Sequence, residues 1–266
     1  MGLPSLLLLP LIPSAALAQV SPDQIIQALT TFNTHADIAL PLPNPAQQKT
    51  LSRGGIFKTI QTLDSGNYRV VGMIVAEIPR NQLWIANQHP RYGSYDSLIE
   101  TMLAADNDRQ VWYGFADFPS PFADRHWVVD NWNNHVLAEK TDNRQWEHLW
   151  RQHANGVEPA RGSAEQGKLE GLDQATFDAA IVIPATLGGV AMLDLGNGWT
   201  LMASHSVFDL GGAIPERLLA EYFRQSMDRY FRLQLNRARE QVPVDYRAGG
   251  NAVMPGGDGK PLPHFE

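Results

Sequence analysis

The longest amphipathic pattern in the chain lies near its C-terminus, over residues 208–239 (FDLGGAIPERLLAEYFRQSMDRYFRLQLNRAR). Charged residues occupy one side of this pattern. Large apolar residues recur on the other side at steps of three or four: Leu219, Phe223, Met227 and Tyr230. Pro215 sits where a first helical turn tolerates a missing N–H, so a helix is expected to begin there. The pattern predicts one long helix whose broad apolar face covers a sheet.

Shorter patterns upstream predict strands and two further helices. A first helix is expected from Ser21 to about Asp37, and a short one after Pro79. Strands are expected over residues 56–63, 68–76, 97–104, 110–118, 125–132, 135–139, 179–183, 189–195 and 199–208. Because turn residues join consecutive strands, the sheet is predicted to be antiparallel and the fold class to be α+β.

Three segments show no apolar period. The proline-rich run 41–49 is expected to be an extended linker, and residues 155–174 a long surface loop. The last segment, residues 242–266, contains two Gly-Gly pairs and four prolines and is predicted to be disordered. The resulting organisation is an N-terminal helix and linker over residues 19–53, a main domain over residues 54–241, and a tail.

The first 18 residues predict export. They are uncharged, contain an apolar block, and end in a small-x-small pattern that is typical of a signal peptide cleaved after Ala18. The chain has no cysteine, which excludes a disulfide scaffold and a thiolate metal site. We therefore expect a periplasmic or secreted protein, and a bacterial periplasm fits best.

Composition and charge remove several function classes. The net charge is −7 and no basic run occurs, so a nucleic-acid partner is not expected. His148 and His153 are five positions apart, which does not place them as a helical zinc pair, and no metal site is expected. No phosphate-binding or dinucleotide fingerprint occurs, so no cofactor is expected.

The closing run GGVAMLDLGNGWTLMASHSVFDLGGAIPERLLAEYFRQSMDRYF resembles the C-terminal part of START lipid-transfer domains. The junction between strand and helix carries the resemblance through Asp209, Gly211, Gly212, Ile214 and Pro215. The middle run PSPFADRHWVV is similar to the family's proline-containing turn, with an arginine at position 125. The resemblance covers about residues 54–239 and suggests an exported bacterial member of this helix-grip (SRPBCC) family.

This resemblance implies a helix-grip fold, in which a curved antiparallel sheet wraps around a long C-terminal helix. It implies an internal tunnel for one lipid or other hydrophobic small molecule, and non-enzymatic binding or transport with transient contact to a membrane. Gly211 and Gly212 are the expected hinge of the helical lid. Asn131 stands where a second arginine can occur in the family, so the ligand is left open.

Candidate ligand contacts come from the strands and from the lid helix. They are Tyr113, Phe115, Arg125, Trp127, Asn131, His205, Leu219, Tyr222, Phe223 and Tyr230. Each has a structural alternative. A buried arginine is more often paired, here with Asp117 or Asp124, and a lone histidine such as His205 is more often a core or rim residue. Plain core packing is at least as good an explanation for the aromatic residues of the helix.

Two other classes of function remain open, because a fold does not fix a function. A helix-grip enzyme of cyclase, dehydratase or hydrolase type would need an acid or base in the tunnel. The candidates are His205, His126 and Asp130, but no catalytic arrangement is visible and none is assigned. An envelope assembly factor would instead expose a wide apolar patch.

Overall fold

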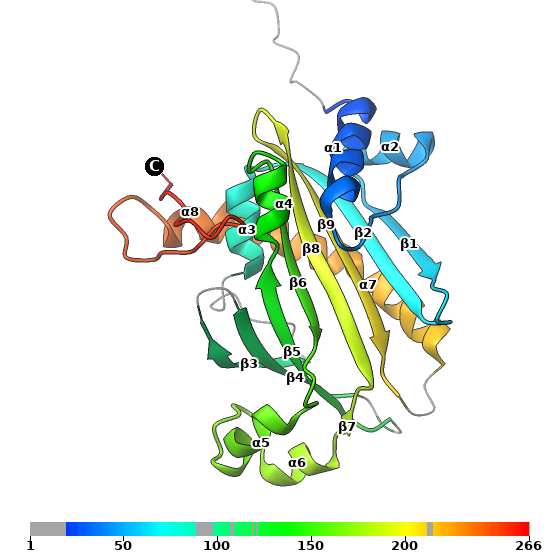
Figure 1. Cartoon of the computed structure of the whole chain (residues 1–266), viewed down its shortest axis with the longest axis vertical. Coiled ribbons are helices and arrows are strands. Elements are labelled where there is room, and N and C mark those ends of the chain that lie inside the picture. The colour runs from blue at the N-terminus through cyan, green and yellow to red at the C-terminus, as the bar shows by residue number, and fades with distance from the viewer. Residues whose placement is uncertain are drawn as a thin grey trace, which may run out of the picture.

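The computed structural model describes residues 20–88, 98–106, 109–118, 120, 122–211 and 215–265. In this part of the chain the strands form one sheet, in the order β1-β2-β9-β8-β6-β5-β4-β3, with β7 paired in parallel to β5 (Figure 1). The strands are β1 (Phe57–Thr62), β2 (Tyr68–Glu77), β3 (Leu98–Ala105), β4 (Arg109–Ala116), β5 (Arg125–Asn133), β6 (Gln145–Gln152), β7 (Ile181–Val182), β8 (Ala185–Gly196) and β9 (Trp199–Asp209). All other strand pairs are antiparallel.

The helices lie on both faces of this sheet. They are α1 (Pro22–His35), α2 (Pro45–Ser52), α3 (Arg80–Gln88), α4 (His135–Lys140), α5 (Glu158–Glu165), α6 (Gln174–Ala179), α7 (Glu216–Asn236) and α8 (Val242–Asp245), with a π-helical turn η2 (Arg237–Gln241) between the last two. None of the helices in the described ranges is long and apolar enough to span a membrane.

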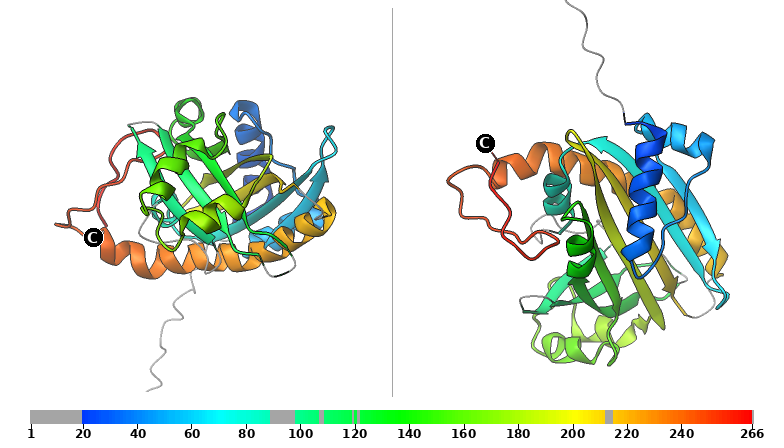
Figure 2. Two further views of the ribbon diagram at one scale, coloured as in Figure 1. Left: turned by 90° about the horizontal axis from the view of Figure 1, so that it is seen from below. Right: turned by 45° about the horizontal axis from the view of Figure 1, so that its top comes forward.

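The long helix α7 crosses one face of the curved sheet, and η2 and α8 continue it (Figure 2). Its buried residues are Leu219, Ala220, Met227, Phe231, Gln234 and Leu235. This arrangement confirms the predicted α+β class and the helix-grip architecture, in which the sheet bends around the C-terminal helix. The helix forms because its apolar positions repeat at 3.6-residue spacing and the sheet offers them a matching apolar surface.

The N-terminal segment covers the opposite face. The predicted first helix begins at Ser21, whose side chain accepts a hydrogen bond from Gln24 N while the Gln24 side chain caps Ser21 in return. The predicted linker 41–49 is only partly extended. Asn44 and Gln47 form a second capping box that starts α2 within it, with Pro45 in the first turn.

Three features of the middle of the chain differ from the prediction. Residues 135–139, expected as a strand, form α4 after the N-cap Asn134. Strand β6 was not predicted, although it lies in the centre of the sheet between β8 and β5. Residues 155–174 are not a surface loop. They contain α5, and Ala160, Ala164 and Leu169 are buried against Tyr113 on β4. Small alanine side chains carry this contact, which is why no strong apolar period was visible.

The C-terminal tail, residues 242–265, also differs from the prediction of disorder. Tyr246 is buried, and the Trp84 Nε1–H donates to the Pro255 carbonyl at 3.1 Å. A Cβ added at Gly257 would lie 2.6 Å from Trp146 Cβ, so the backbone lies directly on that tryptophan. The glycine in the tail therefore allows the backbone to pack closely on an indole and is not a sign of disorder.

Candidate functional site

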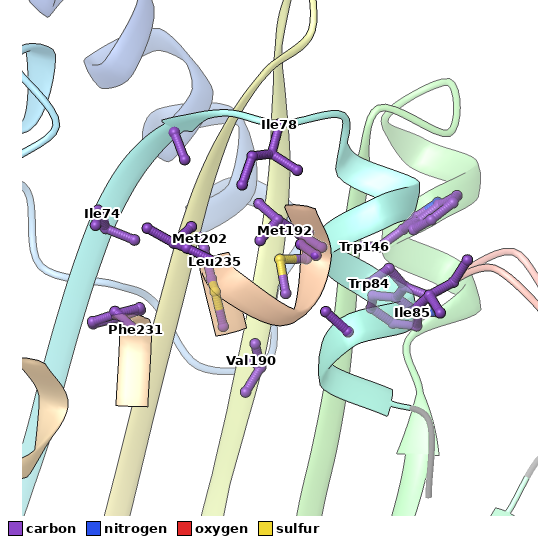
Figure 3. Close-up of a cluster of buried hydrophobic side chains, with 14 of the residues drawn as sticks. Ile74, Ile78, Trp84, Ile85, Trp146, Val190, Met192, Met202, Phe231 and Leu235 are labelled. Carbon is purple, nitrogen blue, oxygen red and sulfur yellow. The ribbon is translucent and has the colours of Figure 1, made fainter. Parts of the chain in front are cut away.

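The two faces of the sheet can be assigned from the side chains that α7 touches. Beneath α7, a Cβ at Gly72 on β2 would lie 2.8 Å from Phe231 Cε2. Met202 and Met192 share a buried cluster with Phe231 and Leu235 (Figure 3). We call the face that carries these residues the α7 face, and the other one the opposite face. Strand register extends the assignment to the remaining strands.

Three tryptophans on neighbouring strands share the α7 face. Trp150 on β6 packs against the cluster beneath α7 and lies in register with Asn131 on β5. By strand alternation Trp127 is on the same face, and Trp112 on β4 follows through its pairing with Val129. All three indoles are only partly buried although they belong to the face that α7 crosses.

Glycines beneath two of these indoles let the rings lie on the sheet. A Cβ at Gly114 would be 2.5 Å from Trp127 Nε1, and one at Gly188 would be 2.7 Å from Trp150 Cε2. Real Cβ atoms do not approach so closely, so each glycine makes room for an aromatic ring. The result is an aromatic surface across β4, β5 and β6.

The end of this surface near the start of α7 carries mostly apolar side chains, with Glu216 at its edge. Phe208 on β9 stacks on Phe223 of α7, with the ring centroids 4.5 Å apart, and Leu219 is buried beside them. A pocket of about 10 Å³ lies here, lined by Tyr68, Val70, Phe208, Glu216, Leu219, Ala220 and Phe223. This volume accommodates about one water molecule, so a lipid needs the surrounding side chains to move.

The end beside α3 carries uncharged polar groups. Asn87 Nδ2 on α3 donates to the Tyr230 hydroxyl of α7 at 2.7 Å. His148 Nδ1 on β6 lies 2.9 Å from Asn133 Oδ1, and the His148 ring meets Trp84 of α3 edge to face. Gln234, one helical turn after Tyr230, is buried, and its Oε1 has no hydrogen-bond partner among the described residues.

Burial fixes the protonation of these groups near neutral pH. It lowers the pKa of His148 to about 4, so the imidazole is neutral. Burial also raises the pKa of Tyr230 well above its ordinary value, which keeps the phenol protonated. On β3, desolvation raises the pKa of Glu100 while the nearby charge of Arg237 lowers it, and the Glu100 side chain keeps contact with solvent.

Arg125 lies on the α7 face but is held by backbone carbonyls. Its Nε donates to Leu210 O at 2.8 Å, its Nη2 donates to Gly211 O at 3.3 Å, and its Nη1 donates to Ala123 O. Its side chain is 2% exposed. The structural alternative thus describes Arg125 better than a ligand contact does. The partners are carbonyls of the strand–helix junction, whereas Asp124 Oδ1 accepts from the Phe118 amide.

Several predicted contacts do not lie under α7. Tyr113 and Phe115 are on the opposite face and pack against Phe177 and its neighbours from α5 and α6. His205 is also on the opposite face, because it pairs with Gly189 and Val71 between the α7-face positions of its strand. Tyr222 is on α7 but points outward, with 64% of its surface exposed. Strand alternation alone cannot choose a face, which depends on the register between distant strands.

The proposed acid and base candidates are also away from the α7 face. His126 contacts the Tyr113 hydroxyl through Nδ1 at 3.2 Å. Asp130 lies 3.1 Å from Arg109 Nη2. Together with His205, both belong to the opposite face of the sheet. The described chain contains no group of three His, Asp or Glu side chains that could hold a metal ion.

Of the expected hinge, Gly211 is described and has a φ of 63°, a left-handed conformation that favours glycine. Gly212 lies outside the described residues. Sequence reasoning missed three residues of the α7 face, Trp112, His148 and Trp150, and two on the helices next to it, Asn87 and Gln234. The available signal was the spacing of Trp146, His148 and Trp150 at every second position, which is typical of one face of a strand.

A second, open pocket of about 550 Å³ lies at the far end of the sheet. It is bounded by the start of α3, the turn between β8 and β9, and the C-terminal tail, with Arg80, Asp194 and Lys260 among its lining residues. The Arg80 guanidinium stacks 3.5 Å above the centre of the Trp146 ring.

Comparisons with solved structures identify a START-like fold. The STAR-related lipid transfer protein from Xanthomonas axonopodis is 13% identical, with a TM-score of 0.51, over 70% of this chain and 94% of that one. Human StAR-related lipid transfer protein 5 is 9% identical, with a TM-score of 0.51, over 82% of this chain and 95% of that one.

The Zhui aromatase/cyclase from Streptomyces sp. R1128 is 13% identical over 68% of this chain and 98% of that one, with a lower TM-score of 0.41. No family model and no curated protein matches the sequence. At these identities the comparisons establish the fold alone.

Proposed function

We propose that this protein binds a hydrophobic small molecule, a lipid or a molecule of similar size, between α7 and the sheet. The observation that carries the proposal is the row of partly exposed indoles, Trp112, Trp127 and Trp150, on the face that α7 crosses. Transfer of apolar ligand surface onto such residues is favourable by about 25 cal/mol per Å². Apolar walls with a few polar groups are the usual composition of small-molecule sites.

The START-like fold supports this proposal, since the two similar structures described above with TM-scores of 0.51 are named as STAR-related lipid transfer proteins. Loading requires movement, because the pocket of about 10 Å³ at the start of α7 is too small for a lipid. We propose that displacement of α7 around Gly211 opens the site, and that transient contact with a membrane supplies the ligand. Export to the periplasm is part of the same proposal.

The first test is native mass spectrometry of the full chain purified from its own host, followed by organic extraction. A stoichiometric hydrophobic adduct supports binding. The second test is quenching of tryptophan fluorescence by the methyl ester of a brominated fatty acid, which carries no charge. Replacing Trp127 with Phe should reduce the quenching, whereas replacing Trp132, which lies on the opposite face of the same strand, should not. Absence of an adduct together with absence of quenching contradicts the proposal.

An enzyme remains the alternative. The positions of the three acid or base candidates from the sequence weigh against their acting on a ligand under α7. His205, His126 and Asp130 lie on the face away from α7. An acid or base acting on a ligand under α7 would have to be another residue, such as His148 or Glu100. Chemical change of an extracted ligand during incubation with the protein, lost in His148→Phe, would favour the enzyme.

A further inference from the structure

The charged groups around the α7 face restrict the kind of ligand that the proposed site can take. Two cations lie on this face of the described strands, Lys58 and Arg125. Lys58 Nζ is 2.5 Å from Asp228 Oδ2 of α7, so that charge is paired. Arg125 donates to the carbonyls of Leu210 and Gly211 at the strand–helix junction. Neither cation is available to pair with an anionic headgroup.

The described strands also place a carboxyl group, and no further cation, next to the aromatic surface. Glu100 on β3 lies on the α7 face, in register with Gly114 and next to the aromatic surface. Its nearby positive charge is Arg237, which interacts with the carboxyl group itself. Burying a phosphate or carboxylate beside these groups without a dedicated cation is costly.

The polar groups at the end beside α3 are suited to a ligand that donates a hydrogen bond rather than to an anionic headgroup. Gln234 Oε1 is buried and lacks a donor in the described chain. His148 Nδ1 lies 2.9 Å from Asn133 Oδ1, and in the tautomer that donates to this oxygen Nε2 keeps its lone pair. The Tyr230 oxygen accepts a hydrogen bond from Asn87. The Tyr230 oxygen is therefore already engaged, and the acceptor left for a ligand is Gln234 Oε1, with His148 Nε2 beside it. A buried acceptor is stabilised when a ligand supplies a donor.

These groups share α3 as a neighbour. Trp84 of α3 contacts the His148 ring, and Asn87 of α3 bonds Tyr230, which precedes Gln234 by one turn. The other end of the surface, at Phe208 and the start of α7, is mostly apolar. The site is therefore polar at one end and mostly apolar at the other, and this difference can orient a ligand.

Building on the proposed function, we infer that the ligand is a neutral lipid with a hydroxyl or similar uncharged donor. The donor lies beside α3, close to Gln234 and His148, and the apolar tail runs toward Phe208. Lipids with a phosphate or free carboxylate are disfavoured in this site.

The test uses three lipids that share one acyl chain, with binding followed by native mass spectrometry and tryptophan fluorescence of the full chain. Monooleoylglycerol carries hydroxyl donors, methyl oleate carries none, and oleoyl lysophosphatidic acid adds a phosphate. We expect monooleoylglycerol to bind tightest. Its preference over methyl oleate should be about fivefold, the factor that corresponds to roughly 1 kcal/mol for one net hydrogen bond.

A pair of variants on α7 tests where the hydroxyl donor of the ligand binds. Gln234→Met should remove the preference for monooleoylglycerol over methyl oleate, whereas Gln225→Met, on the exposed side of the helix, should keep it. If lysophosphatidic acid binds as tightly as monooleoylglycerol or more tightly, with the same fluorescence change, the inference about a neutral ligand is overturned. The proposed binding of a hydrophobic molecule would still stand. Failure of all three lipids to bind counts against the proposed function itself. Because the lipid series uses the unaltered protein, a folding defect in the Gln234 variant cannot hide the answer.

Discussion

Arg125 Nε donates to the Leu210 carbonyl at 2.8 Å and joins the first residue of β5 to the end of β9, 85 positions away in the chain. The same guanidinium reaches Gly211 O, just before the junction to α7. A side chain that is 2% exposed thus holds the point from which the long helix departs. The arginine that resembles a ligand contact in the sequence is a structural anchor of the segment that leads into α7.

Replacement of Arg125 with lysine should destabilise the protein, because one ammonium group cannot reproduce a planar fork that serves several carbonyls. We expect the free energy of unfolding to fall by about 2 kcal/mol, the scale of a hydrogen bond to a charged group. Urea denaturation measures this loss. Arg232→Lys, on the exposed side of α7, is the control, and equal stability of the two variants would show that Arg125 is not an anchor.

Gly114 should be intolerant of a side chain. An alanine Cβ there would meet Trp127 Nε1 at 2.5 Å, so the indole must leave its place on the sheet. We expect Gly114→Ala to cost about 1 to 3 kcal/mol, as overpacking does, and to shift the tryptophan emission. In Gly162→Ala the added methyl group meets nothing within 4 Å, and stability should stay the same or rise. Unchanged emission in Gly114→Ala contradicts the described position of Trp127.

The C-terminal tail gives a third prediction. In Gly257→Ala the new methyl group would lie 2.6 Å from Trp146 Cβ, and the tail must lift away. Limited proteolysis should then cut within residues 246–265 faster than in the unaltered protein. Val253→Ala is the matched control, because the Val253 side chain is 65% exposed. Equal cleavage of the two variants would mean that the tail is disordered, as its sequence predicted, and is not packed on Trp146.

Local signals explain what the sequence could predict. The helical spacing of Leu219, Phe223 and Met227 predicted α7, and the glycine-containing turn predicted the hairpin of β8 and β9. Gly196, Asn197 and Gly198 all adopt positive φ at that turn, which is the conformation that such residues favour. These elements depend on a few neighbouring residues, so composition and spacing were sufficient.

Features that depend on distant contacts could not be predicted. On β6, Gln145, Glu147 and Leu149 are all buried on the opposite face, so the usual alternation of apolar and polar positions is absent. The faces of Tyr113 and His205 depend on pairing between strands that are far apart in the chain. The contribution of α7 to the candidate site was predictable from helical spacing. Assigning the strand residues to a face of the sheet required the register between strands.

Buried Glu147 gives the last prediction, a dependence of stability on pH. Its Oε2 accepts from Asn134 Nδ2 at 2.8 Å, whereas its Oε1 has no partner among the described residues. Burial raises its pKa from 4.5 to about 7 in the folded protein. As the pH rises from about 4.5 to about 7, the unfolded chain loses this proton first, so the free energy of unfolding falls. The stabilisation is complete below pH 4.5 and lost near pH 7.

Glu147→Gln removes this titration while keeping an acceptor for Asn134. Buried histidines such as His205, whose pKa is lowered to about 3, act in the opposite direction, because their contribution is lost as the pH falls below 6.5. The informative quantity is therefore the difference between the two proteins, in which the histidines cancel. From pH 4.5 to 7, urea denaturation should show the unaltered protein losing on the order of 2 to 3 kcal/mol relative to Glu147→Gln. Parallel stability curves would mean that Glu147 loses its proton at the same pH in the folded and unfolded chains, so that its carboxylate has partners beyond Asn134.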